Sequence, residues 1–190
     1  MKAVYVVRDP EVAKVLVDPM RRAILSFLRE KPMTQAQLAD ELGLSDASLN
    51  YHMKILKEKG LVTLTKKVAE EHGIIQKFFS PAACLFVYDI DVLPKDISRY
   101  FYPQSLERAR SVISIQDLGA GAHDAHSVNA ISDNLSRLLV STAKEYVKKE
   151  VPYGSDETIH EIYGKAISAL GKKGPISNGS RDVHHRRKQR

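Results

Sequence analysis

Residues 34–62 read TQAQLADELGLSDASLNYHMKILKEKGLV, and this stretch decides the fold. Thr34 is a good N-cap for a helix over 35–41, because its hydroxyl oxygen can accept a hydrogen bond from an unpaired N–H of the first turn. Gly43 ends that helix, and Ser45 caps the next one. Two helices joined by a short turn that contains glycine are typical of a helix-turn-helix.

The second helix of this pair has one apolar stripe and one polar face. Leu49, Met53 and Leu56 fall at i, i+4 and i+7, so they line one side of a helix that ends at Gly60. Most side chains on the other faces are short polar or planar groups, which suit contacts in the major groove of DNA. Asn50 has the paired donor and acceptor that adenine requires. We therefore predict that this helix enters the major groove.

The predicted DNA contacts come from the starts of both helices, the outward face of the second helix and a basic segment after it. Helix N-termini favour phosphate oxygens, and lysine side chains supply charge opposite to that of the DNA backbone. The full set is Thr34, Gln35, Ser45, Ser48, Asn50, Tyr51, Lys54, Lys57, Lys66 and Lys67. His52 lies next to the buried Met53, and we expect it to pack at the border of the helix.

Segments on both sides of this pair complete a winged helix. Residues 61–65 and 74–79 are rich in β-branched and aromatic residues and have polar residues between them, which predicts a β-hairpin, the wing. Residues 19–30 before the pair have helical spacing and a proline in the first turn. A short strand at 3–7 and a short helix at 10–16 are expected before that helix.

The second half of the chain, residues 83–171, is predicted to be a helical arm. Its apolar residues recur at helical spacing, and prolines or glycines separate the segments. The expected elements are a linking strand at 84–90 and helices at 94–102, 103–118, 124–150 and 155–170. The fold class is therefore mainly α with a small β wing: a winged helix-turn-helix followed by a helical dimerisation arm.

The helix expected at 124–150 carries the argument for a dimer. It would be roughly 40 Å long, with an apolar stripe from Val128 to Tyr146. The stripe either packs against the last helix of its own subunit or pairs with the same helix of a second chain. Because a helix of about 27 residues has more apolar face than a partner of about 16 residues covers, we expect a homodimer through the C-terminal helices.

Charge and composition limit the remaining possibilities. The formal net charge is +6, and residues 172–190 hold seven Lys or Arg residues but one acidic residue. We expect that segment to be a disordered basic tail, after a DNA-binding domain at 1–82 and the arm at 83–171. The single cysteine, Cys84, excludes an intrachain disulfide, and no apolar run approaches the ~18 residues that span a bilayer. The first residues do not match a signal peptide, so we expect a cytoplasmic protein without membrane contact.

Two segments resemble a known family. LSDASLNYHMKILKEKGLV at 44–62 looks like the recognition helix of the ArsR family of winged-helix regulators, with matches at Ser45, Tyr51-His52, Leu56-Lys57 and Gly60-Leu61-Val62. RDPEVAKVLVDPMRRAILSFLREKPMT at 8–34 resembles the archaeal branch, whose members carry a C-terminal helical arm. The resemblance covers about residues 8–80 and implies a dimer that binds a two-fold operator, usually as a repressor. Some metal-sensing members have a Cys-x-Cys pair on the recognition helix, and the absence of cysteine there excludes such a thiolate site.

We predict a sequence-specific DNA-binding transcriptional regulator that acts as a homodimeric repressor on double-stranded DNA. Two alternatives stay open: a DNA-architectural, nucleoid-type protein with low sequence preference, and a winged-helix protein-interaction module. The sequence has no P-loop, G-x-S-x-G or H-E-x-x-H motif, so we do not expect an enzyme. His123, Asp124 and His126 lie close together, but we assign no metal site and no cofactor, and any effector is unknown.

Overall fold

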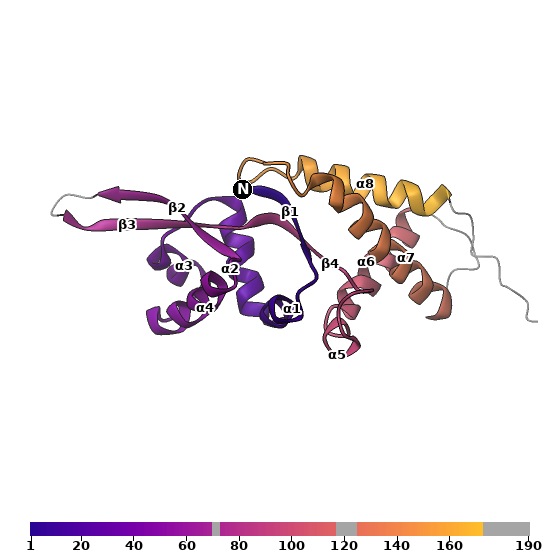
Figure 1. The fold of residues 1–190 in the computed structure, drawn as a ribbon, viewed down its shortest axis with the longest axis horizontal. Coiled ribbons are helices and arrows are strands. Elements are labelled where there is room, and N and C mark those ends of the chain that lie inside the picture. The colour runs from indigo at the N-terminus through magenta and orange to yellow at the C-terminus, as the bar shows by residue number, and fades with distance from the viewer. Residues whose placement is uncertain (70–72, 117–124, 173–190) are drawn as a thin grey trace, which may run out of the picture.

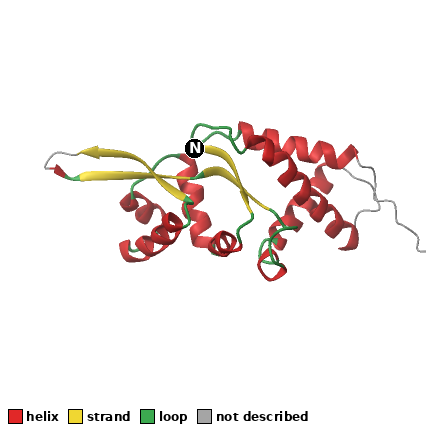
Figure 2. Cartoon of the chain, in the orientation of Figure 1, coloured by secondary structure: helices red, strands yellow, loops and turns green. Residues whose placement is uncertain are grey.

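The computed structural model describes residues 1–69, 73–116 and 125–172 (Figure 1). The chain is mainly helical, with two small two-stranded sheets (Figure 2). The helix-turn-helix and its long hairpin lie at one end of the molecule, and the C-terminal helices lie at the other. The expected fold class, mainly α with a small β wing, is confirmed. Except for Lys172, the expected basic tail falls outside the described residues. No helix in the described ranges is long and apolar enough to cross a membrane.

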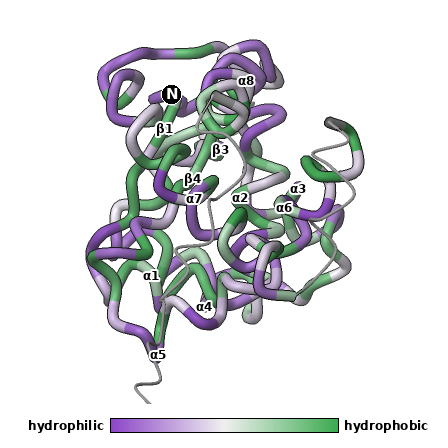
Figure 3. Tube along the Cα trace, turned by 90° about the vertical axis from the view of Figure 1, so that its right-hand side faces the viewer, coloured by the Kyte–Doolittle hydropathy of each residue, from purple (hydrophilic) through white to green (hydrophobic). Residues whose placement is uncertain are grey.

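The winged helix has the predicted order of elements. These are α1 (Pro10–Val17), α2 (Pro19–Glu30), α3 (Gln35–Leu42), α4 (Asp46–Glu58) and the antiparallel strands β2 (Val62–Ala69) and β3 (Ile75–Pro81). Hydrophilic and hydrophobic residues alternate along the helices (Figure 3), as expected for helices with one buried face. The largest buried side chains include Ile24, Leu28, Leu38, Leu49, Met53 and Leu56. β2 is longer than expected, because Lys66 and Lys67 also pair with β3.

The turn between α3 and α4 has the expected caps. Thr34 Oγ1 accepts a hydrogen bond from the Gln37 N–H at 3.2 Å, and the Gln37 side chain accepts one from the Thr34 N–H at 2.9 Å, which makes a capping box. Gly43 closes α3 with a left-handed backbone (φ 62°), which residues other than glycine rarely adopt. Ser45 accepts a hydrogen bond from the Ser48 N–H and starts α4. These local bonds fix which side chains α4 exposes.

A second core joins the first strand to the C-terminal helices. β1 (Lys2–Val7) pairs in parallel with β4 (Ala83–Tyr88). After the short α5 (Lys95–Ser98), α6 (Tyr102–Gln116) and α8 (Glu157–Lys172) pack on α7 (Ala125–Ala143), which lies against both strands. Ala3 and Val4 are buried in this core, whereas Val7 is buried in the core of the winged helix. β1 therefore contributes to both cores.

The predicted extent of the long helix at 124–150 is wrong. α7 ends at Ala143, and one 3-10 turn over Lys144–Tyr146 follows. Tyr146 is buried there, and its hydroxyl donates a hydrogen bond to Glu161 of α8 at 2.6 Å. This contact stabilises the turn, although the sequence has no glycine or proline at that point.

The argument for a dimer from an uncovered apolar stripe is therefore also wrong. Leu135, Leu139 and Tyr146 are buried inside their own chain, in the core that includes Ile162 and Ala166 of α8. This C-terminal part of the stripe packs within the subunit, whereas Val128 and Ile131 at its start are only half-buried. Homodimerisation itself stays a prediction.

The boundary between the helices expected at 94–102 and 103–118 also differs. α5 ends at Ser98, and α6 already starts at Tyr102. Pro103 therefore lies in the first turn of α6, where its missing N–H costs nothing, and it does not end the preceding helix.

The connection between α7 and α8 holds the two cores together. The Val151 N–H donates a hydrogen bond to the Met1 carbonyl at 2.9 Å, and the Gly154 N–H donates one to the Arg29 carbonyl at 3.0 Å. The Arg29 guanidinium also pairs with Asp156 at 2.9 Å. The arm thus contacts the end of α2, a few residues before α3 begins.

Candidate nucleic-acid interface

The polar face of α4 is open to solvent. Leu49, Met53 and Leu56 are buried, as their spacing predicts, and the exposed residues on the other faces of the helix include Asn50, Tyr51, Lys54 and Lys57. Tyr51 is 61% exposed, and the Lys54 side chain is 77% exposed. Lys54 forms only a loose pair with Glu58 at 4.0 Å, and such an exposed pair holds its charge weakly. A helix with this face fits the major groove, which is about 12 Å wide.

Asn50 is held by the start of α3. The Gln35 Nε2 donates a hydrogen bond to Asn50 Oδ1, so the amide of Asn50 has a fixed orientation. Its two N–H groups remain as donors, and its oxygen keeps one more lone pair. The paired contact with adenine needs both the oxygen and a donor. Gln35 therefore orients Asn50, a role that the sequence did not suggest.

The hydroxyls at the helix starts have two uses. Thr34 and Ser45 accept hydrogen bonds as caps through their oxygens, which leaves each O–H able to donate to a phosphate. Ser48 is half-buried one turn into α4. All three lie at helix N-termini, where the positive end of the helix dipole favours an anion. Phosphate contacts by these residues stay a prediction.

The charge of Lys57 is directed toward the wing. Its ammonium group lies 4.9 Å from the centre of the Phe79 ring. Phe79 is buried on β3, and its backbone exchanges two hydrogen bonds with Met33, at 2.8 Å and 3.1 Å. Lys57 thus packs α4 against the base of the wing, a contact that contributes about 0.5–1 kcal/mol. A DNA contact by Lys57 stays a prediction.

The wing carries a basic pair that includes one residue missed from the sequence. Lys67 lies directly opposite Lys77 in the register of β2 and β3, and both are exposed. Neither has a carboxylate partner within the described part of the chain. Like charges opposite each other cost stability in a sheet, so this pair suits a polyanionic partner. Lys66 lies on the other face of the hairpin, 5.8 Å from the Phe78 ring.

His52 lies at the border of α4, as predicted. The residue is half-buried, and its ring centre is 5.3 Å from the ring centre of Tyr51 in an edge-to-face arrangement. Its Nδ1 is buried and has no hydrogen-bond partner among the described residues. His52 therefore supports the position of Tyr51, which is the more exposed of the two rings.

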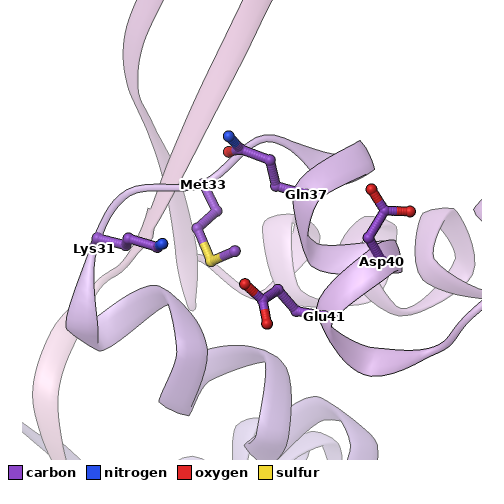
Figure 4. A pocket seen from close by; sticks show the side chains of 5 residues that line it. All are labelled: Lys31, Met33, Gln37, Asp40 and Glu41. Carbon is purple, nitrogen blue, oxygen red and sulfur yellow. The ribbon is translucent and has the colours of Figure 1, made fainter.

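A hollow beside α3 does not fit a nucleic acid. It has a volume of about 320 Å³ and is lined by Lys31, Met33, Gln37, Asp40 and Glu41 (Figure 4). The carboxylates of Asp40 and Glu41 come from the exposed side of α3. Their charge would repel phosphate, so this hollow is not part of the interface.

Cys84 and the aromatic residues at 100–102 have ordinary surroundings. Burial raises the pKa of the Cys84 thiol, which disfavours a reactive thiolate. Phe101 is buried in the core of the winged helix, whereas Tyr100 and Tyr102 are exposed.

No group of three or more His, Cys, Asp or Glu side chains comes together in residues 1–69, 73–116 and 125–172. His123 and Asp124 fall outside these ranges.

Comparisons with known proteins agree with this geometry. A family model described as a helix-turn-helix domain matches residues 16–65, which run from the end of α1 into β2. The transcriptional repressor SdpR of Bacillus subtilis strain 168 is 34% identical over 56 residues, which are 30% of this chain and 62% of that protein. The chain thus matches about three fifths of the length of this relative.

Two solved structures show weaker similarity. A double mutant of Lactococcus lactis ZitR in apo form has 21% identity and a TM-score of 0.31, covering 66% of this chain and 83% of that one. Bacillus subtilis PadR in complex with operator DNA has 16% identity and a TM-score of 0.32, covering 83% and 94%. Together, the family match and the SdpR similarity support a helix-turn-helix protein of the kind found in transcription regulators, which are not enzymes.

Proposed function

We propose that the chain is a DNA-binding transcriptional regulator that places α4 in the major groove and the wing along the backbone. The observation that carries the proposal is the combination of an exposed polar face, formed by Asn50, Tyr51 and Lys54, with the unneutralised pair Lys67 and Lys77. Reading bases needs the first feature, and binding phosphates needs the second. The helix-turn-helix match and the similarity to a repressor support the same function.

The finer proposal is an ArsR-like homodimeric repressor that acts in the cytoplasm, where its DNA would be. The name of the repressor relative supports repression. Ile115 on α6 is 83% exposed, and an isoleucine this exposed is a candidate contact between two copies through their C-terminal helices. A two-fold dimer would place its two α4 helices about 34 Å apart, in successive major grooves.

The test is a selection from random duplexes of about 40 base pairs, long enough for two half-sites one helical turn apart. The recovered duplex and a scrambled duplex of the same composition are then titrated at about 50 and 200 mM salt, and the mass of the complex is measured. We expect two protein chains per site and binding at least about 1000-fold tighter to the recovered duplex. The preference should persist at the higher salt concentration.

Other outcomes would point to different functions. Equal binding to both duplexes that disappears at about 200 mM salt would contradict a sequence-specific regulator and favour a DNA-architectural protein. The absence of DNA binding at both salt concentrations would leave the protein-interaction module. A complex that holds one chain per site would contradict the dimer alone.

A further inference from the structure

A cleft lies in the arm, away from the wing (Figure 1), and all of its lining residues fall between 90 and 137. Its volume is about 480 Å³, within the range of small-molecule sites. The walls come from the segment after β4, from α5, and from α6 and α7. None of the residues in the candidate nucleic-acid interface lines it.

The charges in the cleft are only partly paired. Arg137 of α7 binds Asp91, with its Nε 3.0 Å and 3.1 Å from the two carboxylate oxygens. Lys95 and Arg99, which also line the cleft, have no carboxylate partner among the residues that the structure describes, and Arg99 lies over the Tyr100 ring instead. Asp133 likewise has no cationic partner among the described residues. Three cations and two carboxylates give the cleft a formal charge of +1.

The walls of the cleft belong to both cores. Leu93 and Ile97 are buried in the core of the winged helix together with Phe101, whose ring stacks on Tyr88 at 3.7 Å. α7, which supplies Arg137, packs in the second core. A molecule in the cleft would therefore contact side chains attached to each core.

We propose that this cleft binds a small molecule with a compact oxyanion, either a carboxylate or a phosphate group. The planar guanidinium of Arg99 and the ammonium of Lys95 would bind its oxygens, because charge-assisted hydrogen bonds of this kind are the strongest that side chains offer. Tyr102 lies on the same lining and its hydroxyl can donate to a further oxygen, whereas the Ser105 hydroxyl already donates a hydrogen bond to the Phe101 carbonyl at 3.2 Å. Bound there, the anion stabilises one position of the arm against the winged helix. An effect of the bound anion on DNA affinity rests on the proposed function. The binding of the anion itself does not depend on that function.

The experiment titrates the full chain, without DNA, with succinate, inorganic phosphate and uncharged glycerol at constant ionic strength. Calorimetry gives the affinity, and NMR locates the binding through the amide signals of α5 and α7. We expect saturable binding of at least one anion with a Kd below about 1 mM, and no binding of glycerol. Stronger binding of succinate identifies a carboxylate ligand, and stronger binding of phosphate identifies a phosphorylated one.

Variants with opposite expected effects test the location. Lys95→Gln/Arg99→Gln should weaken binding about ten-fold, and Asp133→Asn should tighten it about three-fold, because it removes a negative charge from the cleft. The matched control is Lys144→Gln/Lys148→Gln, which removes two exposed cations elsewhere on the arm and should leave the affinity unchanged. Equal weakening in both double variants would overturn the proposal, because it would indicate diffuse attraction to a basic chain. Failure of both anions to saturate would also overturn it, and Asp133→Asn keeps the test valid if a double variant unfolds.

Discussion

At the scale of single residues, a hydrogen bond joins the side chains of Gln35 and Asn50. It connects the first residue of α3 to the polar face of α4, so two residues that sequence analysis treats as separate contacts act together. Side chains in one hydrogen-bonded unit do not contribute additively to binding. Gln35 and Asn50 should therefore be coupled.

A double-mutant cycle on DNA affinity measures this coupling. Asn50→Ala should cost about 1–3 kcal/mol on the selected duplex, because it removes a base contact. Gln35→Ala should cost less. The loss in the double variant should be smaller than the sum of the two single losses, by about 0.5 kcal/mol or more. Strict additivity on the selected duplex would show that Gln35 does not orient Asn50.

Thr34 makes a second prediction at this scale. Thr34→Ala removes the acceptor of the capping box and should lower the free energy of unfolding by about 1 kcal/mol in a urea titration. Thr34→Ser keeps the hydroxyl and is the matched control, expected within about 0.3 kcal/mol of the wild type. Equal losses in both variants would mean that the methyl group, and not the cap, accounts for the effect.

The sequence predicts residues well where one helix alone decides their exposure. Asn50, Tyr51 and Lys54 follow from the helical period and the buried stripe of α4. Lys57 and Lys77 do not, because their surroundings depend on how the wing packs and on the register of its strands. A lysine next to a buried phenylalanine and a lysine opposite another lysine look alike in the sequence.

At the scale of elements, the wing combines a stability cost with a binding role. Lys77→Ala removes the repulsion across the hairpin, so it should raise the free energy of unfolding by about 0.2–1 kcal/mol. The same change should weaken binding to every duplex and reduce the slope of log K against log salt by about 1. Urea titration and binding at three salt concentrations check both effects. If DNA affinity and the slope do not change, the wing pair does not bind phosphate.

The end of α7 predicts a pH-dependent contribution to stability. The hydrogen bond from Tyr146, more than any other cause, holds the pKa of the Glu161 carboxyl below its ordinary value of 4.5. A carboxyl with a lowered pKa stabilises the fold above its unfolded pKa, and this stabilisation is lost as the pH falls through the folded value. Tyr146→Phe should therefore lower the melting temperature at pH 7, and the difference from the wild type should shrink as the pH falls below about 4.5.

Tyr163→Phe is the control for this measurement. It removes a hydroxyl from the neighbouring half-buried tyrosine of α8, for which the described residues provide no carboxylate contact. Its difference from the wild type should not depend on pH. A difference between the wild type and Tyr146→Phe that is the same at pH 7 and pH 3 would contradict the role given to Glu161.

The order of the elements could be predicted, but some of their ends could not. The helices and hairpin between residues 10 and 81 follow from apolar period, caps and turn residues. The end of α7 depends on Tyr146 meeting α8, a contact between segments that are distant in sequence. Local propensity over 144–150 favours continuing the helix, and the tertiary contact prevails.

At the scale of the whole molecule, the two halves are more closely joined than the sequence suggests. A boundary near residue 82 divides the chain into a DNA-binding domain and an arm, but β1 and β4 from the two sides pair in one sheet. Parallel pairing between strands about 80 residues apart leaves no local signal in the sequence. The connection after α7 adds the contact between Arg29 and Asp156 at the end of α2. A change in the arm therefore has a direct structural path to the helix-turn-helix.

The most direct test of the central claim compares two double variants on the selected and scrambled duplexes. Asn50→Ala/Tyr51→Ala changes the face of α4, and Lys67→Ala/Lys77→Ala changes the wing. We expect the first to reduce the ratio of the two affinities at least ten-fold, and the second to weaken both affinities similarly while keeping the ratio. Equal, sequence-independent losses from both variants, or an unchanged ratio in the first, would contradict the claim that α4 reads the bases while the wing binds the backbone.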